Sequence, residues 1–145
     1  MDEAAVTQMI ARDRVEWDRL TAVLDAHPGD VLHKAGAPWT SRDIYAHLAR
    51  WLVHSNADME AHRAGLPISP PSDAADAEAI NARWQKEDAV LTLVEARARA
   101  FGAFERRDQI IRSIRADEWD STLERICHYD GWAHLEMHRR YISLG

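Results

Sequence analysis

The chain has 145 residues, a formal net charge of −6, six tryptophans and one cysteine, Cys127. This length is typical of a single domain with room for a hydrophobic core, so we expect residues 1–145 to form one domain. The acidic balance disfavours nucleic acid as a ligand, since phosphate binding needs a surplus of Lys and Arg on one surface. A single cysteine excludes an internal disulfide and is typical of a reducing compartment.

Membrane and export signals are not found in the sequence. No apolar run approaches the roughly 20 residues that cross a bilayer. The first ten residues, MDEAAVTQMI, are acidic and lack the basic and apolar regions of a signal peptide. We therefore expect a cytoplasmic protein with no membrane partner.

The first predicted helix runs from about Asp2 to Ala26. The sequence HPGD follows it and ends it, since Pro28 and Gly29 both disfavour a continuing helix. Its inward face is marked by apolar side chains spaced by three, four and seven residues: Val6, Ile10, Trp17, Leu20 and Leu24.

The second predicted helix begins after Trp39, where Thr40 or Ser41 can act as the N-cap. Asp43 then stands in the first turn, where the helix dipole favours a negative charge. The helix continues to the Pro-rich stretch AGLPISPPS, which is too long for a tight turn. We expect this stretch, residues 65–72, to form a long crossover.

The third predicted helix covers Asp88–Arg115, and the DAADAEAINARWQKED before it is either helix or an ordered loop. The last helix covers roughly Tyr129–Ser143. No stretch alternates with a period of two, so we expect no strands. The predicted fold class is all-α, a four-helix bundle with one long crossover. The side chains expected to point inward from the third helix are Val90, Leu91, Val94, Ala98, Phe101, Ile111 and Ile114.

The segment GWAHLEMHRRYI near the C-terminus contains His134 and His138, four residues apart. On a helix these two imidazoles lie about 40° apart and one turn apart, so both can reach one point. They are either ordinary helix histidines or a metal-binding pair that needs a third ligand. Glu136 projects about 200° away from His134, which separates this segment from the zinc-protease HExxH pattern.

The second helix offers candidates for that third ligand. His47 and His54 lie seven residues apart and so share one face of the helix, to within about 20°. Each is either a metal ligand or a boundary histidine with an ordinary hydrogen bond. Asp43 and Asp130 each precede a candidate ligand by one turn, so each is either a partner for the second imidazole nitrogen or a charge at the start of a helix. Cys127 is expected to be a small buried hydrophobe.

Three motifs resemble those of a known superfamily. APWTSRDIYAHLARW is similar to the W-[ST]-x-x-[DE]-[IVL]-x-x-H-L pattern that opens the second helix of the DinB/YfiT-like superfamily. WAHLEMHRRYI resembles its closing H-x-x-x-H-x-x-x-[IL], and INARWQKEDAVLTLVEARARAFGAF resembles the start of its third helix. Within the superfamily the chain looks most like the ClbS/DfsB-like branch, or the N-terminal domain of the mycothiol-dependent maleylpyruvate isomerases.

The resemblance implies a four-helix bundle with a divalent metal, zinc or nickel, held by three histidines. Carried over to this chain, these ligands are His47, His134 and His138. The resemblance selects His47 over His54, because the motif histidine follows the tryptophan by eight residues, as His47 follows Trp39. Members of the superfamily are commonly dimers, so a homodimer is expected.

Three neutral imidazoles leave an open position on the metal. An activated water there would give a hydrolase, and a bound low-molecular-weight thiolate would give a thiol transferase or isomerase acting on a small electrophile in stress or detoxification. His54 is then a candidate general acid or base. The alternative is a non-catalytic metal-binding or interaction protein, in which a structural metal or the histidine cluster alone stabilises the bundle or a partner interface. A structural metal would be closed by a fourth ligand such as His54. Four tryptophans either line a cavity near the metal or belong to the core or an oligomer interface: Trp17, Trp51, Trp84 and Trp132.

Overall fold

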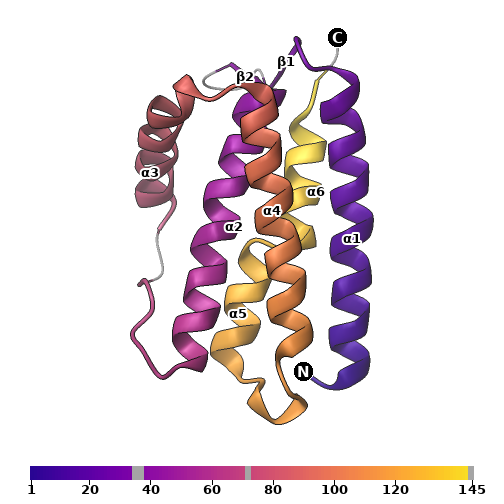
Figure 1. The fold of residues 1–145 in the computed structure, drawn as a ribbon, viewed down its shortest axis with the longest axis vertical. Helices are drawn as coiled ribbons and strands as arrows, with labels where there is room; N and C mark the ends of the chain where they lie inside the picture. The colour runs from indigo at the N-terminus through magenta and orange to yellow at the C-terminus, as the bar shows by residue number, and fades with distance from the viewer. Residues whose placement is uncertain (34–37, 71–72, 144–145) are drawn as a thin grey trace.

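A computed structural model describes residues 1–33, 38–70 and 73–143, which are mostly helical (Figure 1). None of the helices in these ranges is long and apolar enough to cross a membrane. In chain order the elements are α1 (Glu3–Ala26), β1 (Val31–His33), β2 (Trp39–Thr40), α2 (Ser41–Arg63), α3 (Ala74–Glu87), the 3-10 turn η1 (Asp88–Val90), α4 (Leu93–Ser113), the 3-10 turn η2 (Ala116–Glu118), α5 (Ser121–Tyr129) and α6 (Trp132–Tyr141).

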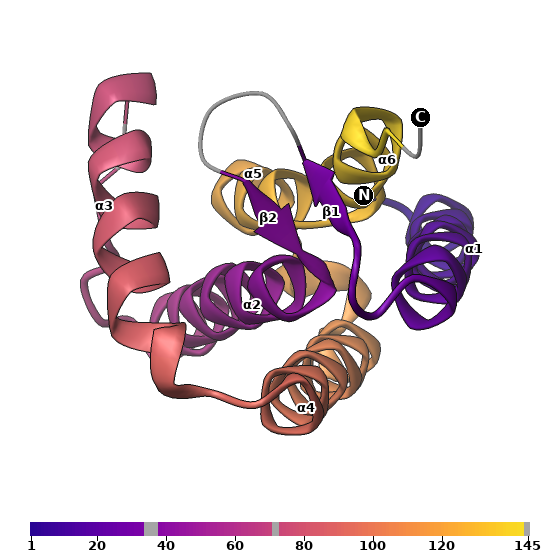
Figure 2. The same cartoon turned by 90° about the horizontal axis from the view of Figure 1, so that it is seen from above.

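The helices α1, α2 and α4 lie side by side with the successive pair α5 and α6 (Figure 1). α2 packs against α4 and α5, and α1 packs against α6. α3 stands outside this group, next to α2 (Figure 2). The apolar side chains between the helices include Trp17, which stacks on Phe104 with ring centroids 4.2 Å apart.

The predicted start of α2 is confirmed. Thr40 is the N-cap, and its backbone N–H donates to the Asp43 carboxylate at 3.0 Å. Asp43 also receives a hydrogen bond from the Arg42 guanidinium at 3.0 Å. Asp43 is therefore a first-turn charge that completes a capping box.

The segment before the third predicted helix is a helix of its own, α3, so the expected number of helices was too small. Asp73 caps it by accepting the backbone N–H of Asp76 at 2.8 Å. The Pro-rich crossover leads into it, and there Ser69 donates its N–H and its hydroxyl to Asp58, both at 3.2 Å. Residues 71–72 of the predicted crossover lie outside the described residues.

The predicted start of the third helix at Asp88 was wrong. Residues 88–90 form the turn η1, and α4 begins only after Thr92, whose hydroxyl accepts the N–H of Glu95. Val90 and Val94, expected to be inward, are therefore exposed by 85% and 77%. Ala98 is exposed as well, while Leu91, Ile111 and Ile114 are buried as expected and Phe101 is partly buried. The buried face of the first turns of α4 consists of small residues, Ala96, Ala100 and Ala103.

Two further expectations about secondary structure were wrong. β1 and β2 form a short antiparallel pair, in which Val31 lies opposite Thr40 and His33 opposite Trp39. Strands of two or three residues are too short to show a period of two. The predicted last helix, 129–143, is present as α6 but begins only at Trp132, because Asp130 and Gly131 separate it from α5.

Candidate metal centre

The break between α5 and α6 is held by a buried ion pair from distant helices. Asp13 of α1 accepts the backbone N–H of Trp132 at 2.8 Å and so caps the first turn of α6. Arg107 of α4 donates to Asp13 at 3.2 Å and to the carbonyl oxygen of Cys127 at 2.8 Å. Asp13 is 4% exposed and Arg107 1%. The start and direction of α6 therefore depend on contacts with α1 and α4.

Gly131 is required at this break by the space available. A Cβ atom at Gly131 would lie 2.8 Å from Nη2 of Arg107 and 2.9 Å from the carbonyl oxygen of Cys127. Neither atom can move freely, because the two are hydrogen-bonded to each other. Glycine has no Cβ atom and so avoids both clashes, and α6 begins one residue later.

The structure brings together the three histidines that the sequence selected. Nε2 of His138 lies 3.0 Å from Nε2 of His47 and 2.9 Å from Nε2 of His134. Within the described part of the chain, the ligand atoms of this trio lie within 4.8 Å of one another, and no other His, Cys, Asp or Glu belongs to the group. His138 is 4% exposed, and the other two are partly buried.

These three nitrogens fit a divalent cation better than they fit one another. An imidazole Nε2 has a single hydrogen-bonding position, either one proton or one lone pair. His138 cannot use that position for linear hydrogen bonds to two neighbours at once. A cation between the rings would satisfy all three lone pairs. Nitrogen ligands of a tetrahedral zinc lie about 3.3 Å apart, so the observed distances need only a small outward movement of the rings.

The protonation of the trio also suits a cation. Burial lowers the pKa of His47 and of His138 well below their usual range, and it lowers the pKa of His134. For His47 and His138 the neighbouring histidines lower the pKa further. All three rings are therefore neutral near pH 7, which is the form that binds a metal.

Asp130 lies beside the trio and at the end of a helix, not at the start of one. It ends α5, is 7% exposed and receives a hydrogen bond from the Ser55 hydroxyl of α2. One of its oxygens is 3.6 Å from Nδ1 of His134. Burial raises the pKa of Asp130, and a positive charge on His134 would lower it. A cation held by the trio would stabilise this carboxylate in its ionised form.

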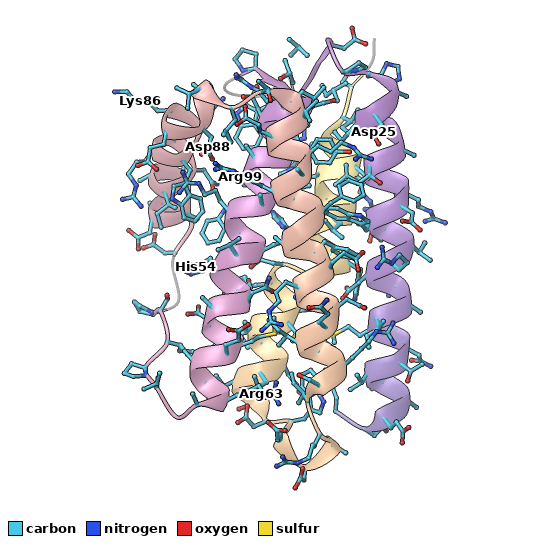
Figure 3. All side chains as sticks on the ribbon, in the orientation of Figure 1. Asp25, His54, Arg63, Lys86, Asp88 and Arg99 are labelled. Atoms are coloured by element: carbon cyan, nitrogen blue, oxygen red, sulfur yellow. The ribbon has the colours of Figure 1, made fainter. Side chains whose placement is uncertain are left out.

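His54 is not part of the trio. Its Nε2 lies 3.6 Å from a carboxylate oxygen of Asp58, and its ring packs edge-on against Trp51 with centroids 5.5 Å apart. Figure 3 shows His54 on the side of α2 that faces α3 and the crossover. It faces the same pocket as the trio, about two helical turns further along α2.

The trio opens into a pocket of about 610 Å³ between α3 on one side and α2, α5 and α6 on the other. Two aromatic side chains that the sequence reasoning missed stand at its histidine end. Trp39 contacts the His47 ring with centroids 4.8 Å apart, and His33 stacks on His138 at 5.2 Å and 3°. Trp39 immediately precedes the N-cap of α2, which was a signal for its place, whereas nothing in the local pattern marks His33.

Of the four tryptophans considered from the sequence, only Trp51 lines this pocket. Trp17 is 1% exposed in the core, Trp84 packs edge-on against Trp51, and Trp132 lies under the Arg12 guanidinium. Cys127 is fully buried, as expected, and burial raises the pKa of its thiol to about 11. Glu136 pairs with Arg140 on α6 and is not among the residues that line this pocket.

Comparisons of the chain with protein-family models, with curated proteins and with solved structures find no match. The candidate site consists of the three histidines, the carboxylate beside them and the pocket that they face.

Proposed function

We propose that this chain is a divalent-metal-dependent enzyme of the DinB/YfiT-like type that acts on a small electrophilic molecule. The observation that carries the proposal is a trio of histidines, His47, His134 and His138, at one end of a pocket of about 610 Å³. Pockets of this volume take small organic molecules. The motif resemblance and the side-by-side packing of α1, α2, α4 and α5–α6 support the same proposal.

Each group near the trio has a separate task in this proposal. His47, His134 and His138 hold the ion, zinc or nickel, and Asp130 offsets its charge and orients the His134 ring. When bound there, the ion supplies a Lewis acid with an open position, suited to hydrolysis or to transfer of a low-molecular-weight thiol. His54, whose Nε2 faces Asp58, is the proposed general acid or base of the pocket.

The alternative is a non-catalytic protein in which the metal only stabilises the fold or a partner interface. Such a structural site needs a fourth protein ligand to fill the last coordination position of the metal. His54 was the candidate for that role, but its Nε2 faces Asp58, and the metal-ligand cluster found in the described ranges contains only His47, His134 and His138. This arrangement favours the enzyme.

Elemental analysis of protein purified without a polyhistidine tag tests the metal site. We expect about one equivalent of metal in the wild type and in a His54→Ala control, and almost none in a His134→Ala, His138→Ala double variant. Equal, substoichiometric metal in the wild type and the double variant would contradict the site.

A second measurement separates the enzyme from the alternative. Metal-loaded protein is assayed for hydrolysis of 4-nitrophenyl acetate and for conjugation of a thiol to 1-chloro-2,4-dinitrobenzene. Metal-dependent turnover of either probe that falls in His54→Ala supports the enzyme. Full metal loading without turnover of either probe favours the structural metal.

A further inference from the structure

The pocket extends well beyond the trio, along the length of α2. His47, Trp51 and Asp58 of α2 all line it, and positions 47 to 58 span about 16 Å of the helix axis. α3 forms the opposite wall, and it lies outside the main group of helices beside α2 (Figure 2). The cavity is therefore an elongated trough with the histidines near one end.

Several polar side chains along this trough are already hydrogen-bonded within the protein. Asn81 of α3 accepts the indole N–H of Trp51 at 2.6 Å. Asp58 accepts the N–H and the hydroxyl of Ser69, and Asp130 accepts the hydroxyl of Ser55. A polar ligand beside these groups would have to break their bonds, or lose its own bonds to water without replacing them.

The remaining surface of the trough is largely apolar. Ile126 is 6% exposed, while the charged side chains of Glu78 and Arg125 are exposed and so lie at its rim. Removing an apolar ligand from water against such a surface is favourable at little cost to the protein. The apolar and aromatic side chains that line the trough include Trp39, Trp51, Ile68, Ile126, Tyr129, Met137 and Tyr141.

We propose that the substrate is a small molecule in which one metal-coordinating group is joined to an elongated apolar body that lies along α2 toward Ile68 and Ile126. The inference rests on the proposed function, because the coordinating group needs the metal held by the histidine trio. The apolar body gives affinity, and the coordinating group places the reacting bond beside the metal.

A chain-length series tests the apolar body separately from the metal. The probes are straight-chain hydroxamic acids from acetohydroxamic to octanohydroxamic acid, titrated into protein loaded with Co²⁺ and followed by the visible absorbance of the ion. We expect the dissociation constant to fall by about threefold to fourfold for each added methylene, until the chain is longer than the trough.

Two substitutions on α3 provide a matched pair. Ala77 lines the trough and is partly buried, whereas Ala79 is exposed and is not among the lining residues. Ala77→Asp should leave the affinity for acetohydroxamic acid within about twofold of the wild type and weaken octanohydroxamic acid by about tenfold or more. Ala79→Asp should leave both affinities unchanged.

The outcomes distinguish this inference from the proposed function. Failure of every hydroxamic acid to change the Co²⁺ spectrum would overturn the open metal position, and both proposals with it. Binding that does not depend on chain length would overturn the apolar body and leave the metal site in place. Equal losses in Ala77→Asp and Ala79→Asp would also overturn the apolar body, since the effect would then not come from the trough.

Discussion

α2 and α6 contribute histidines to the same trio, yet the two helices begin in different ways. α2 is 23 residues long and starts at a capping box between Thr40 and Asp43, which are neighbours in the sequence. α6 has 10 residues, and its first turn is capped by Asp13, more than a hundred positions away. The start of α2 is thus set locally, and that of α6 by tertiary contacts. We expect the α6 side of the site to be the more sensitive to distant substitutions.

The largest loss of stability is expected from Arg107→Met. The substitution leaves Asp13 buried without its cationic partner and releases the carbonyl oxygen of Cys127. We expect a loss of about 3–5 kcal/mol in the free energy of unfolding, measured by urea denaturation, together with weaker metal binding. Arg106→Met, also on α4, breaks the exposed pair with Glu60 of α2 and should cost less than about 1 kcal/mol.

A second substitution tests whether the Asp13–Arg107 pair supports metal binding by placing α6 or only by stabilising the fold. Adding Asp13→Leu to Arg107→Met removes the buried charge and should restore much of the lost stability. Metal affinity should stay low, because Asp13→Leu removes the carboxylate that caps the N–H of Trp132. Recovery of both properties would show that α6 does not need this pair for its placement.

Two glycine substitutions compare the break with an open position. Gly131→Ala places a methyl group 2.8 Å from Nη2 of Arg107, and we expect it to cost about 1–3 kcal/mol and to weaken metal binding. Gly102→Ala lies within α4, where a Cβ atom meets nothing within 4 Å. It should stabilise the protein by up to about 1 kcal/mol in the same denaturation experiment. Changes in the free energy of unfolding that have the same sign in both variants would contradict the crowding at the break between α5 and α6.

The two aspartates that precede a histidine by one turn give a direct comparison of the two sides. Asp130→Asn should weaken metal binding by about 10- to 100-fold in a competition titration with a coloured chelator, because the charge beside His134 is lost. Asp43→Asn should change the affinity much less, since Asp43 bonds to Thr40 and Arg42. Similar losses in the two variants would argue against a specific role for Asp130.

The smallest effect is expected at the cap of α2. Thr40→Ala should cost about 1 kcal/mol of unfolding free energy, measured by thermal denaturation. Metal affinity should change by less than about threefold, because Leu48 and Leu52, each 1% exposed, anchor α2 in the core beyond its first turn. A loss of affinity as large as that of Gly131→Ala would show that the start of α2 is no more independent than that of α6.

Local signals in the sequence were enough for several parts of this molecule. The bounds of α1, the cap of α2 at Thr40 and the pairing of His134 with His138 on one face all follow from residues close together in the chain. The resemblance to the DinB/YfiT-like superfamily then selected His47, and the structure places its Nε2 3.0 Å from that of His138. Caps and helix faces depend on neighbours within one turn, so they can be predicted from the sequence.

Tertiary structure decided the break between α5 and α6, the place of α3 and the environment of Asp130. Arg107 and Asp13 end one helix and start another although neither is near Gly131 in sequence. α3, outside the main helices, forms the wall that turns the side of α2 into a trough. Helical spacing shows which residues share a face, but it cannot show what a distant helix places against that face. The chemistry of this site depends both on the residues that share a helix face and on the distant residues that pack against it.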